Sequence, residues 1–480
     1  MGCSYQFLAH SFPRGIISST MSDHPTPGFT PRQRATVLLM VIAVIVVFAM
    51  LAGLIVTSMR SLEGTPPAVS QPFVSQPPTP NSTPSPVPSP VSEEGIWSQV
   101  QAARLFDQIA HQVETLRGLS PRTGVPLSFL DQGEMAALLR QLYTSGDPQA
   151  QVAPYTALGL LPAVPISIRP HQVAGVYVPD QEQLYVATGQ EGSTDDQALL
   201  AHTYVHALQD QHFDLGGTDA RANTTDARLA VQALVEGDAM LLTALYRYED
   251  LAAVDWDHLV ELIVRAEKPG YGDELERSPA WARLQRFPYA EGRQFAEVLF
   301  QADGWGAINR AYTDPPRSSE QILHPERYLH EQDSPTSVVV PDLSAVLGED
   351  WTMRLQDTLG EFVAGLYLGT LLPEQAARQA ADGWDGDTFV LWEHADGSRV
   401  SAWRTIWDST AEAAEFERAF VSWIPQRYFP ARPLDPPRNL VGQWWETGVG
   451  AVCVYRVARY VTVVHAPDLN ALANVVEVLP

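Results

Sequence analysis

The first pattern of apolar positions in the chain is a charge-free run over residues 35–59. At about 1.5 Å per residue, a helix of this length crosses a hydrocarbon layer of about 30 Å. Three arginines precede the run and one follows it closely. Because basic residues favour the cytoplasmic side of a membrane, we expect a cytoplasmic tail at 1–34, one transmembrane helix at 35–59 and an extracytoplasmic location for the rest. The run exceeds the apolar region of a usual cleaved signal peptide, which is the alternative.

Residues 60–92 have no periodicity and consist mainly of Pro, Ser, Thr, Gln and Val. Such a segment buries no apolar face, and its prolines favour an extended, polyproline-like chain. We expect a spacer that holds the following residues away from the bilayer. A recognition role for this segment is the alternative.

Between residues 93 and 382 the apolar positions recur mainly at the helical spacing of three and four residues. Two short alternating runs, 175–178 and 184–187, flank a Pro-Asp turn and predict a β-hairpin. Helices are expected over 96–113, ending at Gly118 or Ser120, and then at 132–143, 295–312, 351–372 and 373–381. The pattern therefore predicts a mostly helical domain with a short hairpin at its edge.

Residues 383–480 follow the order strand, strand, helix twice in succession. The first unit is expected at 388–392, 400–407 and 411–423, and the second at 449–455, 460–465 and 468–478. Two successive ββα units predict a small α+β subdomain at the C-terminus. The fold class expected for the whole chain is therefore α+β, behind one transmembrane helix.

Composition narrows the choice of partners. The chain has 480 residues, a formal net charge of -25 at pH 7 and a pI near 4.8. Nucleic acids and anionic membrane surfaces attract clustered Lys and Arg, so this charge argues against both. The two cysteines, Cys3 and Cys453, lie on opposite sides of the predicted span and cannot pair within one correctly inserted chain. The exported part should therefore be stabilised by packing alone.

Candidate chemistry follows the predicted hairpin directly, where three residues separate His202 from His206. A helix is expected to begin with Thr194 as N-cap and Gln197 completing a capping box, so both histidines lie well inside it. Residues four apart on a helix project from one face, with Cβ atoms about 5–6 Å apart. This spacing suits a zinc ion held by paired imidazoles.

A third ligand is expected from the next helix, which begins at 224–226 and carries Glu236 beside Gly237. A break at 216–217 lets this helix fold back antiparallel to the first. Glycine inside a helix costs about 1 kcal/mol, and it indicates a close approach of another backbone. Two imidazoles, one carboxylate and one open position make a catalytic type of zinc site.

This arrangement, His202-x-x-x-His206 followed by Glu236, resembles the gluzincin group of zinc metallopeptidases, in which a second helix donates a glutamate ligand. The residues after His206 (Ala-Leu-Gln-Asp-Gln) and the motif His324-Pro-Glu-x-Tyr328 are similar to uncharacterised bacterial, membrane-anchored gluzincin-like proteins. The resemblance covers roughly residue 93 to the C-terminus, and only the motif-bearing helices are specific.

The resemblance implies a zincin-like fold over 93–382, zinc as the cofactor, and a site between the two helices. It also implies that Asp210 or Asp238 is the acceptor that fixes an imidazole tautomer, as ligating histidines usually require. Two interpretations stand for His324 and Tyr328: an oxyanion donor facing the metal, or a loop anchored by the intervening proline.

One position departs from the peptidase pattern, because Thr203 stands where His-Glu-x-x-His has its general base. Hydrolysis needs the metal-bound water deprotonated, and losing a positioned base lowers the rate by a factor of about 10²–10⁴. The sequence therefore predicts a membrane-anchored, zinc-binding, metallopeptidase-like protein without catalysis. The alternatives are an active metallohydrolase with a base recruited from elsewhere, and a cell-surface module that binds peptide or cell-wall polymer.

Two further features admit both a functional and a structural interpretation. Trp403 and Trp407 share a strand face, so with Trp384 and Trp392 they either stack on sugar rings or form core. The acidic run at 382–387 suggests a calcium loop, but it lacks the EF-hand order and a turn fits better.

Overall fold

The computed structural model describes residues 99–479, apart from 146–147, 167–172, 174, 189–191, 269, 332 and 438–439. The predicted tail, transmembrane helix and spacer lie outside the described residues. Among the described residues, α7 (Thr225–Arg247) is long and apolar enough to cross a membrane by length and composition. However, 72% of its apolar window is buried inside the protein, and a core helix meets the same criteria.

The described chain begins with α2 (Gln99–Arg117), which ends at Gly118 as predicted; Gly118 has a φ of 71°. A three-stranded sheet follows in the order β1-β3-β2, in which β2 and β3 form the predicted antiparallel hairpin and β1 runs parallel to β3. The helix predicted at 132–143 is α3. The bounds of these elements are β1 (Leu127–Leu130), α3 (Gln132–Ser145), α4 (Pro148–Ala157), β2 (Gly175–Val178) and β3 (Gln183–Ala187).

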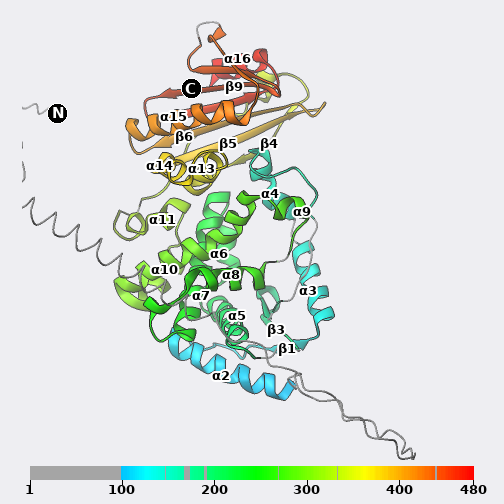
Figure 1. Ribbon diagram of the computed structural model, residues 1–480, viewed down its shortest axis with the longest axis vertical. Coiled ribbons are helices and arrows are strands. Elements are labelled where there is room, and N and C mark those ends of the chain that lie inside the picture. The colour runs from blue at the N-terminus through cyan, green and yellow to red at the C-terminus, as the bar shows by residue number, and fades with distance from the viewer. Residues whose placement is uncertain are drawn as a thin grey trace, which may run out of the picture. The chain divides into compact units, whose positions relative to one another are not determined.

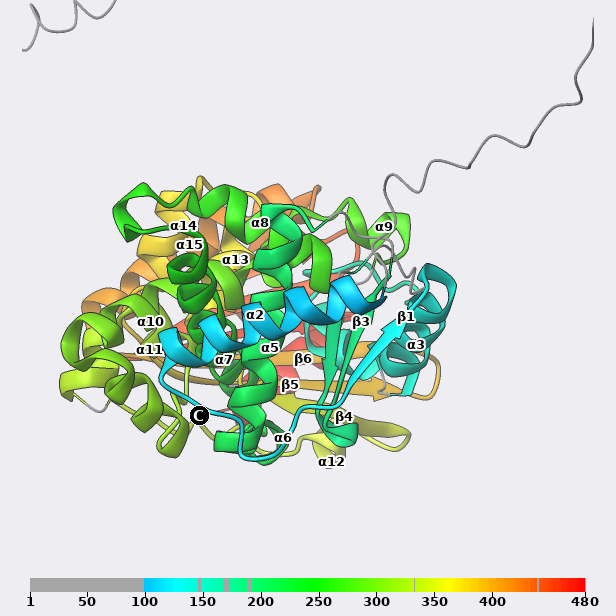
Figure 2. The ribbon, with the colours of Figure 1, turned by 90° about the horizontal axis from the view of Figure 1, so that it is seen from below.

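The central helices of the protein follow β3, and α2 lies across two of them, α5 and α7 (Figure 2). The helix predicted at the histidines is α5, but its cap lies one residue earlier than expected. Ser193 accepts the backbone N–H of Asp196, whose carboxylate accepts the N–H of Ser193. The Asp196 carboxylate therefore closes the capping box, and Thr194 is the first helical residue. The bounds are α5 (Thr194–Phe213), α6 (Leu215–Arg221), α8 (Trp256–Glu267) and α10 (Pro279–Thr313).

Helices α7 and α10 cross at a pair of glycines. A Cβ atom at Gly237 would lie 2.1 Å from the carbonyl oxygen of Gly292, and one at Gly292 would lie 2.2 Å from that of Ala233. Any side chain at either glycine would push the two helices apart. The close backbone approach predicted from Gly237 is confirmed, and it fixes the position of the adjoining Glu236.

A seven-stranded sheet occupies the C-terminal part, coloured yellow to red in Figure 1, with the order β4-β5-β6-β10-β9-β8-β7. The two predicted ββα units are β5-β6-α15 and β9-β10-α16, and both are confirmed. The strands are β4 (Trp351–Asp357), β5 (Trp384–His394), β6 (Arg399–Trp407), β7 (Ala431–Leu434), β8 (Gln443–Thr447), β9 (Gly450–Val457) and β10 (Tyr460–Ala466). The accompanying helices are α11 (Ser319–Leu323), α13 (Gly360–Leu368), α14 (Glu374–Ala381), α15 (Thr410–Arg427) and α16 (Leu469–Val478).

The helix predicted at 351–372 is wrong in its first part, where the chain forms β4 and pairs with β5. Trp351, Met353 and Leu355 alternate at the period of a strand, and the helical spacing of the apolar residues that follow obscured this alternation. The sheet therefore begins well before the predicted subdomain boundary at 383.

Helices cover both faces of this sheet. Trp403 and Trp407 pack with Phe416 of α15 on one face, whereas Trp392 belongs to the apolar cluster that includes α16 on the other. Trp403 is 2% exposed, and Trp384, Trp392 and Trp407 are fully buried. The core interpretation of these tryptophans is confirmed, and none of the four presents a face to a sugar.

The N-terminus of α7 is tied to the end of β4. Thr225 donates its backbone N–H and its hydroxyl to the Asp357 carboxylate, at 2.9 Å and 2.5 Å. The N–H of Asp226 reaches the carbonyl oxygen of Thr358 at 3.1 Å. The first turn of the helix that carries Glu236 is therefore held by the sheet.

Candidate metal centre

Three helices bring four possible ligands together. His202 and His206 lie on α5, Glu236 lies on α7, and Glu267 is the last residue of α8. One ligand atom from each lies within 4.8 Å of the other three. The structure thus unites the three ligands expected from the sequence and adds a fourth, Glu267.

The distances in this cluster suit one small cation. His202 Nε2 lies 3.4 Å from Glu236 Oε2 and 3.3 Å from Glu267 Oε1. His206 Nε2 lies 3.5 Å and 3.6 Å from the same two oxygens. Bonds of about 2.0–2.1 Å from a tetrahedral metal place its ligands about 3.3–3.4 Å apart. His202 Nε2 and Glu236 Oε2 are also buried without a hydrogen-bond partner. A bound cation would satisfy both of these converging atoms.

The second nitrogen of each imidazole is held by a neutral side chain. His202 Nδ1 lies 3.1 Å from the hydroxyl of Thr243, which donates its own proton to the carbonyl oxygen of Ala239 and therefore accepts from the ring. His206 Nδ1 lies 2.8 Å from Gln209 Oε1. With the proton on Nδ1 in both rings, each Nε2 presents its lone pair to the cluster, which is the tautomer that a metal requires.

Asp238 fixes the orientation of Gln209. The Gln209 side-chain nitrogen donates to Asp238 at 2.9 Å and to the carbonyl oxygen of Val235 at 3.0 Å, so its oxygen must face His206. Asp238 also accepts two bonds from fully buried Arg117, at 2.7 Å and 3.0 Å, and one from Tyr312 at 2.9 Å. The carboxylate expected to position an imidazole directly therefore acts through an intervening amide.

The other expected acceptor, Asp210, has different partners. It accepts the hydroxyl of Tyr177 at 2.7 Å and the backbone N–H of Leu215 at 3.2 Å. These bonds fasten the end of α5 to the hairpin and to α6. The imidazoles of the cluster have their Nδ1 partners in Thr243 and Gln209 instead.

Glu267 is oriented by Tyr289, which is fully buried on α10 and donates its hydroxyl to Glu267 Oε2 at 2.9 Å. The other carboxylate oxygen, Oε1, then faces the imidazoles. Glu267 was not predicted from the sequence, although the sequence carries a signal for it. Leu259, Ile263 and Glu267 follow one another at intervals of four on the buried side of α8, and an acidic residue on the apolar side of a helix is unusual.

The charges of the four groups are coupled. Burial lowers the pKa of the imidazoles, but the two carboxylates outweigh it and raise the pKa of His202 and, more strongly, that of His206. Burial raises the pKa of Glu236, and the imidazoles outweigh this and bring it to about 2. The pKa of Glu267 likewise lies well below its usual range. Both carboxylates are therefore ionised at neutral pH, and a metal must displace the Nε2 protons that they favour on the imidazoles.

Thr203 contributes no base to this centre. Its side chain is buried and its hydroxyl donates to the carbonyl oxygen of Leu199, one turn earlier, at 2.8 Å. The bond leaves the hydroxyl engaged with its own helix.

His324 and Tyr328 belong elsewhere. His324 Nε2 lies 3.0 Å from Glu361, in a separate group of possible ligands. The Tyr328 hydroxyl donates to the carbonyl oxygen of Asp314 at 2.8 Å. The structure therefore does not unite either side chain with the two helical histidines, and the loop interpretation of Tyr328 fits its bond.

Comparison with known proteins covers only the C-terminal sheet. Residues 351–476, from the first residue of β4 into α16, match the family described as "Domain of unknown function (DUF8575)". The matched region contains none of the four side chains of the metal centre. No curated protein and no solved structure matches the chain.

Proposed function

We propose that this chain is a zinc-binding, metallopeptidase-like protein that lacks peptidase activity. The observation that carries the proposal is the fourth possible ligand, the Glu267 carboxylate, whose distances to the two imidazoles, 3.3 Å and 3.6 Å, are close to those between ligands of a tetrahedral metal. Closed tetrahedral sites are typical of structural zinc, whereas catalytic sites keep one position for water. Imidazole and carboxylate ligands in tetrahedral geometry favour zinc among the common divalent metals.

Two requirements for hydrolysis are then unmet. Glu267 occupies the position that an attacking water would need, and Thr203 has its hydroxyl bonded to Leu199. A threonine hydroxyl does not accept and return a proton at neutral pH, so the contribution of a general base, about 10²–10⁴ in rate, is lost. The zinc would instead stabilise the fold by joining α5, α7 and α8.

A second candidate function rests on the same glutamate. If Glu267 leaves the metal and a water takes its place, its carboxylate becomes the recruited base of an active metallohydrolase. The favouring observation is the bond from Tyr289, which holds the Glu267 side chain beside the centre by its other oxygen.

Metal analysis and a peptidase assay on the full-length chain separate the two functions. The proposal expects one zinc at this centre, no cleavage of peptide libraries by the wild type, and no zinc there after His202→Ala. It is overturned if the wild type binds no zinc at His202, or if it cleaves peptides and both His202→Ala and Glu267→Gln abolish the cleavage. The second outcome supports the recruited base.

The proposal extends to location. A helix at 35–59 would anchor the chain, with the metal centre on the extracytoplasmic side, where a peptide or a cell-wall polymer is the expected partner. Protection of the described region from added protease in spheroplasts would contradict this topology, because an extracytoplasmic domain is digested once the outer layers of the cell are removed.

A further inference from the structure

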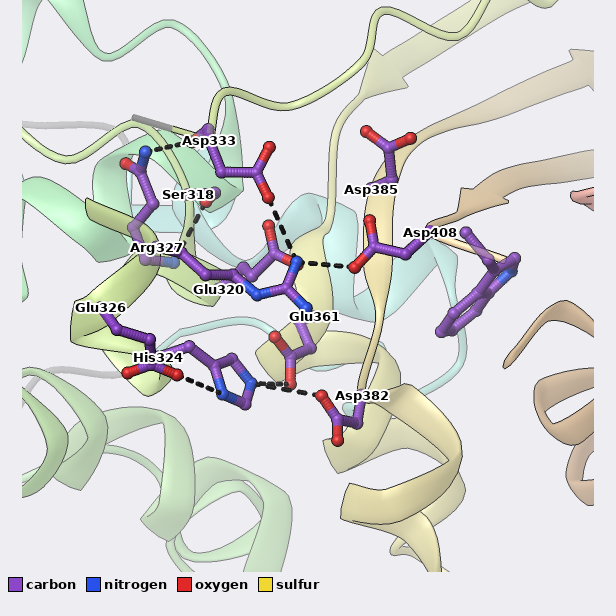
Figure 3. A network of polar contacts seen from close by, with 12 residues as sticks. Ser318, Glu320, His324, Glu326, Arg327, Asp333, Glu361, Asp382, Asp385 and Asp408 are labelled. Carbon is purple, nitrogen blue, oxygen red and sulfur yellow. Dashed lines mark hydrogen bonds and ion pairs between the residues drawn. The ribbon is translucent and has the colours of Figure 1, made fainter. Parts of the chain in front are cut away.

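A second histidine–carboxylate cluster lies where α11, α13 and α14 end or begin. His324 follows α11, Glu361 lies in the first turn of α13, and Asp382 follows α14 (Figure 3). His324 Nε2 lies 3.0 Å from Glu361 Oε1 and 3.6 Å from Asp382 Oδ1. One imidazole nitrogen thus faces two carboxylates that come from separate segments of the chain.

The cluster forms one wall of a cavity of about 400 Å³. Glu361 is 5% exposed, and its second oxygen, Oε2, is buried without a hydrogen-bond partner. The side chains of His324 and Asp382 are 26% and 61% exposed. The site therefore has a buried carboxylate, Glu361, on its inner side and two partly exposed side chains on its outer side. No group in the described chain satisfies the acceptor oxygen Oε2 of Glu361.

The charges around His324 do not balance. An imidazole carries at most one positive charge, yet three carboxylates surround this one. They are Glu361, Asp382 and Glu326, the last at 4.0 Å from Nδ1. The two arginines that line the same cavity already have acidic partners. Arg283 pairs with Glu374, and Arg378 pairs with Glu374 and Glu291.

The neighbouring network in Figure 3 shows how this protein neutralises carboxylates elsewhere. Arg327 lies 2.7 Å from Glu320, 3.2 Å from Asp333 and 2.7 Å from Asp408. A permanent guanidinium at the centre of three carboxylates forms a structural ion network. The His324 cluster also has three acidic groups, but the imidazole at its centre is charged only when it is protonated. A divalent cation could therefore supply the positive charge that this cluster lacks.

We propose that His324 Nε2, Glu361 and Asp382 form a second metal centre, which binds a divalent transition-metal ion and leaves coordination positions open to the cavity. Ligands of a metal with bonds of about 2.0–2.2 Å lie about 2.8–3.1 Å apart in octahedral geometry and about 3.3–3.6 Å apart in tetrahedral geometry, close to the spacing observed. A site of one imidazole and two carboxylates suits Mn²⁺ or Zn²⁺, whereas Ca²⁺ prefers oxygen ligands alone. The proposal does not depend on the function of the first centre.

The test counts metals in the full-length chain equilibrated with Zn²⁺. Wild type should bind two equivalents, and His324→Ala and His202→Ala should each bind one. His330→Ala, an exposed histidine six residues along the chain, is the matched control and should bind two. If His324→Ala retains two equivalents with wild-type affinities, the second centre does not exist.

A second variant removes any ambiguity from misfolding. Asp382→Asn changes a largely exposed side chain, and should weaken the second equivalent at least tenfold without lowering the thermal unfolding temperature of the metal-free chain. With Mn²⁺ as the probe, water bound at the open positions should enhance proton relaxation, and His324→Ala should remove this enhancement. Unchanged binding of both metals by Asp382→Asn would also overturn the proposal.

Discussion

The two histidine–carboxylate clusters differ in what holds the nitrogen that faces away from the cluster. At the first centre, Thr243 and Gln209 accept the Nδ1 protons of His202 and His206, and both are buried. At the second, His324 Nδ1 lies 4.0 Å from the largely exposed Glu326, which is too far for a hydrogen bond. The first set of ligands is preorganised, whereas the second is free to adjust.

This difference predicts different behaviour from similar residues. Rigid ligands with fixed tautomers lose little entropy when the metal binds, so affinity is high and exchange is slow. A half-open site with one fixed carboxylate binds more weakly and exchanges water with the cavity. We therefore expect one centre suited to stability and one suited to an exchangeable ligand, and the variants below test the first of these two expectations.

The largest effect is expected from His202→Ala. Structural zinc contributes about 10–16 kcal/mol of binding free energy through four ligands, so removing one should lower the Zn²⁺ affinity of the first centre on the order of 10³-fold or more. Competition with a chelator of known affinity measures the loss. His111→Ala, an exposed histidine on α2, should leave the affinity unchanged, and an equal loss in this control would contradict the assignment.

Asp238→Asn should have the next largest effect, on stability. The substitution leaves the fully buried guanidinium of Arg117 without its counter-charge, and breaking a buried ion pair on one side costs about 3–5 kcal/mol. Chemical denaturation of the metal-free chain measures the free energy of unfolding. Asp210→Asn is the matched control, because Asp210 bonds a tyrosine and a backbone N–H but no buried arginine; it should cost less.

Gln209→Leu should affect the metal more than the fold. The variant removes the acceptor of the His206 Nδ1 proton, and losing such a partner typically costs about 10–100-fold in metal affinity. Gln211 lies two residues along the same helix, and among the described residues its side chain bonds the segment around Thr123. Gln211→Leu should therefore retain wild-type affinity. Equal affinities in both variants would show that the tautomer needs no such support.

Some elements could be predicted from the sequence because local rules decide them. The break after α2 at Gly118, the hairpin of β2 and β3, and the two ββα units follow from periodicity and turn residues. Gly237 indicated a helix crossing because a glycine in the middle of a helix is locally unfavourable. The structure explains this glycine, because the backbone of Gly292 approaches too closely for any side chain at 237. The strand β4 was missed because its alternation runs directly into the helical spacing that follows.

In the candidate site, only the residues that are related by sequence spacing or lie on adjoining helices could be predicted. His202 and His206 follow from an interval of four, and Glu236 follows from its place beside Gly237 on the next helix, which a family resemblance supports. Glu267 comes from a third helix, and nothing in the sequence spacing states that the end of α8 lies beside Glu236 in the middle of α7. The same limit applies to His324, whose carboxylate partners are Glu361 and Asp382, because only the tertiary structure brings these three together.

The smallest effect, counted for one imidazole over one unit of pH, concerns proton binding at the first centre. The carboxylates raise the pKa of both imidazoles, so protons compete with the metal for each Nε2 up to a higher pH than at a free histidine. Each imidazole that must lose a proton makes the Zn²⁺ affinity fall about tenfold per unit as the pH falls below its pKa. The ionised Glu236, with its pKa near 2, adds nothing to this slope near neutral pH. Affinity measured between about pH 6 and pH 8 should therefore rise with pH more steeply in wild type than in His206→Ala. An affinity that does not change with pH would mean that neither imidazole binds the metal, and the contrast between the two centres would then have no chemical basis.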